Sequence, residues 1–242
     1  MNRFFKIIKT TGKIILVLTT ILVIIYFLGP KPPKPVFDPP VLENFTNQSF
    51  TDLEKTIADR ENAVENIKPD CKARIVWADS TKKEKTKIVM LYLHGFSASH
   101  VEGAPINTDL AKQFGCNIFL ARLSEHGVET GAKNENLLKF NAEDYYDSAE
   151  EALHIAQQLG DSVLIIGQSG GAAMALFLAS RHPELKGLVL YSPAVKVFRK
   201  DGQLMSEPWG LQLAHLTVGE FNDWKFRKPE QARYWTDRKS VV

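Results

Sequence analysis

Apolar and polar residues alternate along most of this chain in blocks that predict strands and helices in turn. Short apolar runs with the composition of buried strands occupy residues 74–78, 87–93, 116–123, 162–167 and 187–191. Apolar residues at helical spacing occupy residues 51–68, 105–114, 141–159, 170–181 and 209–218. Because strands that alternate with helices usually pair in parallel, the pattern predicts an α/β fold with a mostly parallel, doubly wound sheet.

The first of these helices has a recognisable start. Thr51 and Glu54 have the spacing of a capping box, and the apolar positions continue through Val64 and Ile67. We therefore expect the helix to end near Pro69. The next charged segment, residues 79–86, predicts a solvated turn before a central strand that is covered on both faces.

The N-terminus has the pattern of a membrane-targeting segment. Residues 14–28 carry no charge, and the flank 1–13 before them contains four basic residues and no acid. This pattern is typical of a signal peptide or a signal anchor. The run ends at Gly29-Pro30 without a small-x-small cleavage site, so we expect a retained transmembrane anchor. A cleaved signal and a buried core helix are the alternatives.

The anchor also predicts where the remaining chain lies. Basic flanks stay in the cytoplasm, so the body is expected on the opposite side of the membrane. Residues 29–40 hold six of the twelve prolines, and we assign 29–48 as a stiff linker. In an oxidising compartment Cys71 and Cys116 could pair, although both also fit the role of small buried hydrophobic residues.

Length and charge restrict the partners. The 242 residues suggest one domain with appendages, assigned to residues 49–193 as the core and 194–236 as the start of a cap. The net charge is +2, but the N-terminal flank contributes four positive charges, so the rest is slightly acidic. An acidic body disfavours nucleic-acid binding. Two cysteines are too few for a four-cysteine zinc site, and we predict neither a metal nor a cofactor.

The segment Gly167-Gln168-Ser169-Gly170-Gly171 fits the pattern G-x-S-x-G, between a predicted strand and a predicted helix. That context is typical of a nucleophile elbow, in which the small flanking residues allow a tight turn. The Ser169 hydroxyl would then lie at the carboxyl edge of the sheet, with the Gly170 N–H beside it. Alternatives are a non-catalytic turn and a dinucleotide loop, but the latter needs an acid after the next strand.

A second motif stands at the end of another buried strand. His94-Gly95-Phe96 forms a turn whose Phe96 N–H would be a second donor for a developing oxyanion. We expect His94 to orient its own turn, because the acid-base histidine follows the serine in this order of motifs.

Three motifs together, HGF at 94–96, SEHG at 124–127 and GQSGG at 167–171, resemble the α/β-hydrolase superfamily. The similarity is to its monoacylglycerol lipase, lysophospholipase and serine aminopeptidase-like branch, over about residues 74–193. It implies that Ser169 is the nucleophile and that Phe96 and Gly170 donate to the oxyanion. It also implies that His126 is a structural loop residue and that a cap begins after residue 193.

The chain departs from that family after Ser169, where an acid and then a histidine should follow. Only His182 and His215 follow, one in a surface turn and one in an amphipathic cap-like helix, and the loop acids Asp201 and Asp223 have no histidine in the expected place. We therefore expect a C-terminally truncated and inactive chain, whose acid and base lie beyond its end. Residues 237–242 resemble a translated sequencing adapter and are expected to be non-native.

Three functions fit these patterns. The first is a membrane-anchored serine hydrolase that cleaves carboxylic esters, possibly of acyl lipids, through an acyl-enzyme. The second is a non-catalytic binding module of the same fold, and the third is an acyltransferase. The substrate is not determined, although apolar residues of the predicted cap weakly favour acyl chains; these are Leu211, Leu213, Leu216, Phe221, Trp224 and Phe226.

Overall fold

The computed structural model describes residues 2–42, 45, 48–129, 137, 139–219, 221–223 and 239–241. The chain divides into two compact units. The larger comprises Pro35–Lys196 with Asn222–Val241, and the smaller comprises Met1–Lys34 with Val197–Phe221.

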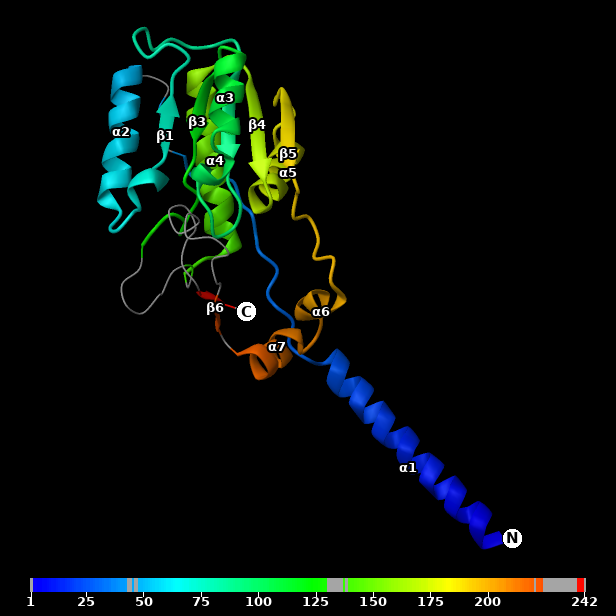
Figure 1. Cartoon of the computed structure of the whole chain (residues 1–242). Coiled ribbons are helices and arrows are strands. Elements are labelled where there is room, and N and C mark those ends of the chain that lie inside the picture. The colour runs from blue at the N-terminus through cyan, green and yellow to red at the C-terminus, as the bar shows by residue number, and fades with distance from the viewer. Residues whose placement is uncertain are drawn as a thin grey trace. The chain divides into compact units, whose positions relative to one another are not determined.

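A five-stranded sheet forms the centre of the larger unit (Figure 1). Its strands, in the order β1-β3-β2-β4-β5, are Arg74–Val76, Asn117–Leu120, Val89–Leu93, Val163–Gln168 and Gly187–Tyr191. Strand β1 pairs antiparallel with β3, and all other pairs are parallel. The prediction of a mostly parallel α/β sheet is therefore confirmed.

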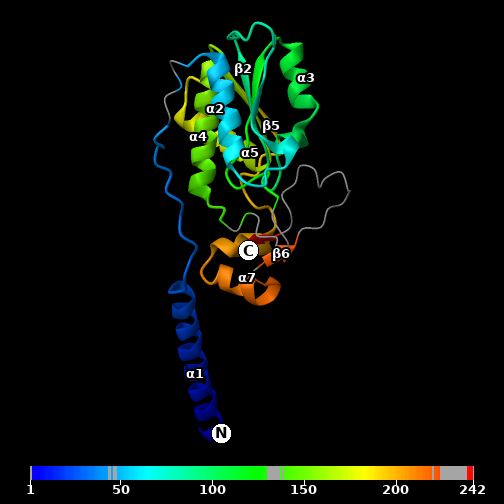
Figure 2. The ribbon, with the colours of Figure 1, turned by 90° about the vertical axis from the view of Figure 1, so that its left-hand side faces the viewer.

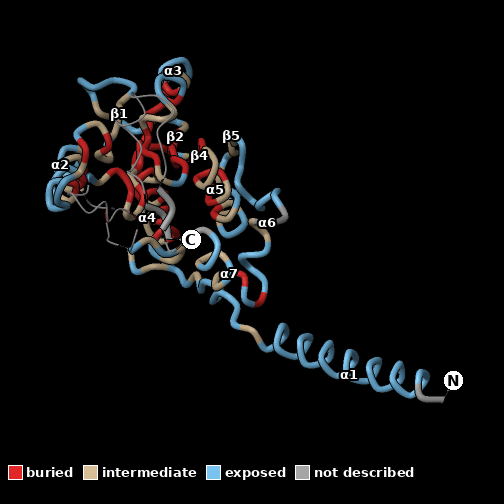
Figure 3. Tube along the Cα trace, turned by 60° about the horizontal axis from the view of Figure 1, so that its bottom comes forward, coloured by how far each residue is buried: buried red, intermediate tan, exposed pale blue. Residues whose placement is uncertain are grey.

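Helices cover both faces of this sheet (Figure 2). Helices α2 (Phe50–Ala63), α4 (Ala142–Leu159) and α5 (Gly170–Arg181) lie on one face, and α3 (Ile106–Gln113) lies on the other. Strand β2 is buried throughout its length, because alternate residues enter two separate cores. The buried strands and the exposed outer faces of the helices are distinguished by colour in Figure 3.

Helix α2 differs from its predicted boundaries at both ends. Ser49 is the N-cap, since its hydroxyl accepts from the Asp52 N–H at 3.2 Å; the expected capping box at Thr51 and Glu54 was wrong. The helix ends at Ala63 and not near Pro69. Three residues later Asn66 has a left-handed backbone (φ 58°) that turns the chain away from the helical path.

The two cysteines are both reduced and buried. Cys71 ends the short 3-10 helix η1 (Pro69–Cys71), and Cys116 directly precedes β3. Burial raises the pKa of each thiol. In this structure the two residues therefore have the alternative role of small hydrophobic side chains.

The smaller unit contains helix α1 (Asn2–Phe27), which runs without a break through the basic flank. Its segment Phe4–Phe27 is long and apolar enough to cross a membrane, with a mean hydropathy of 2.0. The unit also contains α6 (Lys200–Gln203), the 3-10 helix η3 (Leu204–Ser206) and α7 (Gly210–Val218).

A two-stranded pair joins β6 (Phe221–Asp223) to β7 (Lys239–Val241). Strand β7 thus contains the middle of the segment 237–242. Residues 237, 238 and 242, and the cap positions Trp224 and Phe226, lie outside the described residues.

Candidate active site

Ser169 occupies the sharp turn between β4 and α5. Its backbone has φ 51° and ψ −113°, a conformation that costs energy for any residue with a Cβ. The turn is fixed by backbone hydrogen bonds: the Ser169 N–H donates to the Tyr191 carbonyl at 2.9 Å, and the Ser169 carbonyl accepts from Ala194 at 3.0 Å. Backbone hydrogen bonds therefore hold the strained serine at the carboxyl end of the neighbouring strand β5.

Two glycines allow this turn to pack closely. A Cβ on Gly167 would lie 2.6 Å from the Cα of Ala172. A Cβ on Gly171 would overlap the carbonyl oxygens of Leu93 and His94, at the end of β2. Residues without a side chain are therefore required on both sides of Ser169, because a Cβ at either position would collide with backbone atoms.

The turn after β2 lies beside the elbow. The Phe96 nitrogen is 3.4 Å from the point where a Cβ on Gly170 would stand. A Cβ on Gly95 would stand 3.2 Å from the Cβ of Ser169. The Phe96 N–H and the start of α5 therefore lie close together, although they are more than 70 residues apart in the sequence.

His94 is completely buried, and both of its ring nitrogens are engaged by the backbone. Nε2 accepts from the Leu123 N–H at 3.0 Å, so Nδ1 carries the proton and donates to the Gly95 carbonyl at 2.9 Å. Burial lowers the pKa of His94 well below its ordinary value, which keeps the ring neutral. The ring joins the end of β2 to the loop after β3, and it has no nitrogen left for proton transfer.

Glu102 is a half-buried acid beside this site that the sequence patterns did not reveal. It lies in the 3-10 helix η2 (His100–Gly103), and its carboxylate accepts from the Gly95 N–H. Burial raises its pKa to about 7, although the Gly95 hydrogen bond acts in the opposite direction. No motif marks Glu102, because the contact depends on how the loop after Phe96 folds back.

Two tyrosines complete the polar surroundings. The Tyr145 hydroxyl donates to the His94 carbonyl at 3.2 Å, and the Tyr92 hydroxyl lies 3.4 Å from Gln168 Oε1. Burial, and then the charge of Glu102, raises the pKa of both phenols, so both stay protonated. Each hydroxyl is thus a fixed neutral dipole close to the elbow.

An aromatic cluster lies over the Phe96 turn. The Phe96 ring contacts Phe140 and His126 edge to face, with centroid distances of 5.0 and 5.6 Å. His126 is fully buried, its Nδ1 donates to the Ser124 carbonyl at 2.6 Å, and burial lowers its pKa to about 4. His126 is therefore neutral and fixed to its own loop.

The remaining histidines are engaged elsewhere. His182 contacts Glu150 at 2.9 Å and Glu184 at 3.1 Å, at the far end of α5. That helix has 12 residues, so His182 stands about 18 Å from its beginning at Ser169. His100 contacts the Lys72 carbonyl at 3.0 Å, the His154 ring packs against Phe45 with a centroid distance of 5.7 Å, and His215 belongs to the smaller unit.

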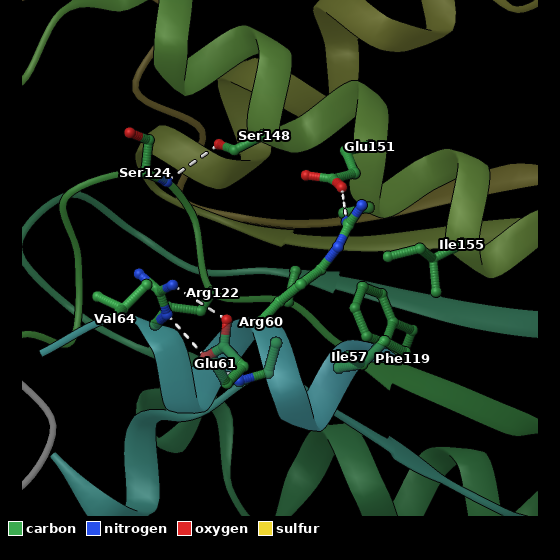
Figure 4. Close-up of a pocket in the computed structure, with 13 residues that line it drawn as sticks. Ile57, Arg60, Glu61, Val64, Phe119, Arg122, Ser124, Ser148, Glu151 and Ile155 are labelled. Atoms are coloured by element: carbon green, nitrogen blue, oxygen red, sulfur yellow. Dashed lines mark hydrogen bonds and ion pairs between the residues drawn. The ribbon is translucent and has the colours of Figure 1, made fainter. Parts of the chain in front are cut away.

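A separate pocket of about 210 Å³ lies between α2, β3 and α4 (Figure 4). Two ion pairs line it. The buried Arg122 guanidinium binds Glu61 through two contacts of 2.7 and 3.0 Å, and Arg60 pairs with Glu151. Because each charge has its partner, the pocket offers no excess charge to a ligand.

Comparison with known proteins agrees with this architecture. The family described as "alpha/beta hydrolase fold" matches residues 88–228, more than half of the chain, so the protein belongs to that family. A thermostable monoacylglycerol lipase of Bacillus sp. (strain H-257) is 28% identical over 114 residues. That match covers 47% of this chain and 44% of the lipase, so the chain spans less than half of this curated relative.

Solved structures of lipolytic enzymes are also similar. A structure from a study of LipS and LipT, two metagenome-derived lipolytic enzymes, has 20% identity and a TM-score of 0.47, with 56% of this chain and 51% of that one covered. A monoacylglycerol lipase of Paleococcus ferrophilus has 15% identity and a TM-score of 0.45, covering 69% of this chain and 65% of its own.

Proposed function

We propose that this protein is a serine hydrolase of carboxylic esters in which Ser169 is the nucleophile. The observation that carries the proposal is the strained conformation of Ser169 between β4 and α5. In the reaction, Ser169 Oγ bonds to the acyl carbon as its proton passes to a base, and the base then gives this proton to the departing alkoxide, which leaves as an alcohol. Water then cleaves the acyl-enzyme and restores the hydroxyl.

The backbone N–H groups of Phe96 and Gly170 are the proposed oxyanion donors. The Phe96 nitrogen lies close to Gly170, and Gly170 opens the helix that follows the serine. Two fixed N–H groups stabilise the tetrahedral intermediate more than the planar ester, and the loss of one such donor lowers the rate by about 10²–10³. His94, Gly95, Gly167 and Gly171 are assigned a structural role in shaping the two turns.

The general base is proposed to come from outside the described site. Among the histidines of the larger unit, His94, His100 and His182 are hydrogen-bonded to other groups, His126 is bound through Nδ1 to the Ser124 carbonyl, and His154 packs its ring against Phe45. Without a base, Ser169 is an ordinary alcohol, so we expect the 242-residue chain to be nearly inactive. The matched lipase favours an ester or acyl-lipid substrate, and the alternatives are a non-catalytic binding module and an acyltransferase.

A fluorophosphonate probe tests the nucleophile. The serine oxygen displaces fluoride from phosphorus, so labelling requires neither a particular substrate nor the second, hydrolytic step. We expect slow labelling of this chain and prompt labelling of protein expressed from any longer reading frame at the source locus. Ser169→Ala should abolish labelling in both, and Ser180→Ala, at the exposed far end of α5, should not. Equal labelling of Ser169→Ala would exclude the assignment and favour the binding module.

We further propose that α1 anchors the protein in a membrane, with its N-terminus in the cytoplasm and the hydrolase unit outside it. The length and hydropathy of Phe4–Phe27 and the basic flank support this proposal. Extraction with alkaline carbonate tests it. An anchored chain stays in the membrane fraction with its N-terminus intact, whereas a soluble form that begins near Pro30 indicates a cleaved signal.

A further inference from the structure

Trp209 connects the end of helix α1 to the beginning of helix α7. The last carbonyls of a helix have no helical partner and need other donors. The Trp209 indole N–H donates to the Ile25 carbonyl at 2.9 Å. The carbonyls on either side of it accept from the N–H groups of Leu28 and Gly29. The Trp209 backbone N–H donates to the Pro30 carbonyl at 3.0 Å. One residue thus makes two hydrogen bonds to the chain at the end of α1.

The contact is built around a glycine and an unusual backbone. A Cβ on Gly29 would overlap the Trp209 ring, with Cε2 only 2.7 Å away. Trp209 has φ 63°, a left-handed conformation that is rare for a bulky residue. This conformation places Trp209 as the N-cap of α7 while its indole reaches α1.

An exposed apolar stripe begins at the same residue. Trp209, Leu213 and Leu216 follow one another at helical spacing along α7, and their exposed fractions are 37%, 56% and 82%. Phe198, near the start of this segment, is 95% exposed and is followed in sequence by Arg199 and Lys200. Large apolar side chains beside basic residues are typical of a segment that lies on a membrane surface.

We infer that this stripe and Phe198 dock on the lipid bilayer, in its headgroup layer at the outer end of α1. The inference rests on the proposed membrane anchor. Helix α1 is long enough to cross the ~30 Å hydrocarbon core, so Ile25 and Gly29 would lie at its boundary. Tryptophan is enriched at that depth, because its ring is apolar while its N–H needs a partner. The docked segment would hold the smaller unit at the lipid surface.

Fluorescence of a polarity-sensitive dye tests this docking. The dye is attached at Leu216→Cys or at Phe198→Cys in the full chain, reconstituted in vesicles of phosphatidylglycerol and phosphatidylcholine. Lys82→Cys, in an exposed turn of the larger unit, is the matched control site, and the unsubstituted chain controls for the two buried cysteines. We expect blue-shifted emission, quenched by brominated lipids, at 198 and 216 but not at 82.

The outcomes separate the docking from the anchor. Release of the chain by carbonate contradicts both. Aqueous emission at 198 and 216 in a retained chain contradicts the docking alone. Blue-shifted emission that brominated lipids do not quench also contradicts it, because the stripe is then covered by protein, either a second copy or a further segment of a longer chain.

A pair of glycine variants tests the role of Trp209. Gly29→Val should displace the indole and lower the lipid quenching at position 216, because the added side chain occupies the ring's place. Gly12→Val in the same helix is the control, since a Cβ there meets no atom within 4 Å. Equal quenching in the two variants would show that the junction does not position the stripe.

Discussion

Glu102 accepts a hydrogen bond from the Gly95 N–H, directly before the residue whose own N–H is the proposed oxyanion donor. The Glu102 carboxyl and the Ser169 Cβ each lie 3.2 Å from the position of a Cβ on Gly95. A half-buried acid therefore stands beside the proposed nucleophile without any partner of opposite charge in the contacts that fix it. This arrangement makes Glu102 a positioning residue for the turn.

We expect Glu102→Leu and Glu102→Gln to differ. Leucine removes the acceptor and leaves the Gly95 N–H unsatisfied, so the Phe96 turn should loosen and Ser169-dependent phosphonate labelling should slow by about 10-fold or more. Glutamine keeps an acceptor oxygen and should label at nearly the original rate. The measurement is the labelling rate in chains whose circular dichroism is unchanged. Equal rates in the two variants would contradict a positioning role.

The raised pKa of Glu102 also predicts how stability depends on pH. The folded protein holds this proton up to about pH 7, whereas the unfolded chain loses it near the ordinary value of 4.5. The folded state therefore binds more protons between these values, and stability falls as the pH rises through this range. The loss should not exceed about 3.5 kcal/mol.

The measurement is urea unfolding at pH 5 and pH 8, in the original protein and in Glu102→Gln. Their difference isolates this group from others that titrate in the same range. Identical pH dependence in the two proteins would show that Glu102 ionises freely in the folded state.

Gly171 should be intolerant of any side chain. Valine there meets the backbone carbonyls of Leu93 and His94, which cannot move without distorting β2. We expect Gly171→Val to lose about 3 kcal/mol or more of stability, or to fail to fold. Gly187→Val is the matched control, because its Cβ would meet no atom within 4 Å and valine favours strands. Thermal unfolding of both variants checks the prediction, and comparable losses would contradict it.

The ion pair of Glu61 with Arg122 should matter more than that of Arg60 with Glu151. The side chains of the first pair are only 9% and 11% exposed, while those of the second are 36% and 38% exposed. Glu61→Leu leaves a buried guanidinium without its partner and should cost about 3–5 kcal/mol. Glu151→Leu should cost less than about 1 kcal/mol, since solvent screens the exposed pair. Chemical denaturation of both variants measures the difference, and similar losses would contradict this explanation.

The sequence alone determined the alternation of strands and helices, since each element's apolar pattern depends on neighbours a few residues away. It predicted β5 and α5 with the bounds that the structure has, and it singled out Ser169 because the elbow is a local turn between two such elements. It placed the start of α2 wrongly, because Ser49 and Thr51 both suit an N-cap and the choice depends on Asp52.

Only the tertiary structure decided which distant groups meet. The Phe96 turn lies against Gly170 because β2 and β4 are adjacent in the sheet, a pairing that no local pattern specifies. The raised pKa of Glu102 and the lowered pKa of His94 likewise depend on burial that other segments produce. The hydrogen bond from Trp209 to Ile25 also depends on the tertiary structure, because it joins residues 184 positions apart. Contacts of that range depend on how the whole chain packs, and sequence spacing does not encode them.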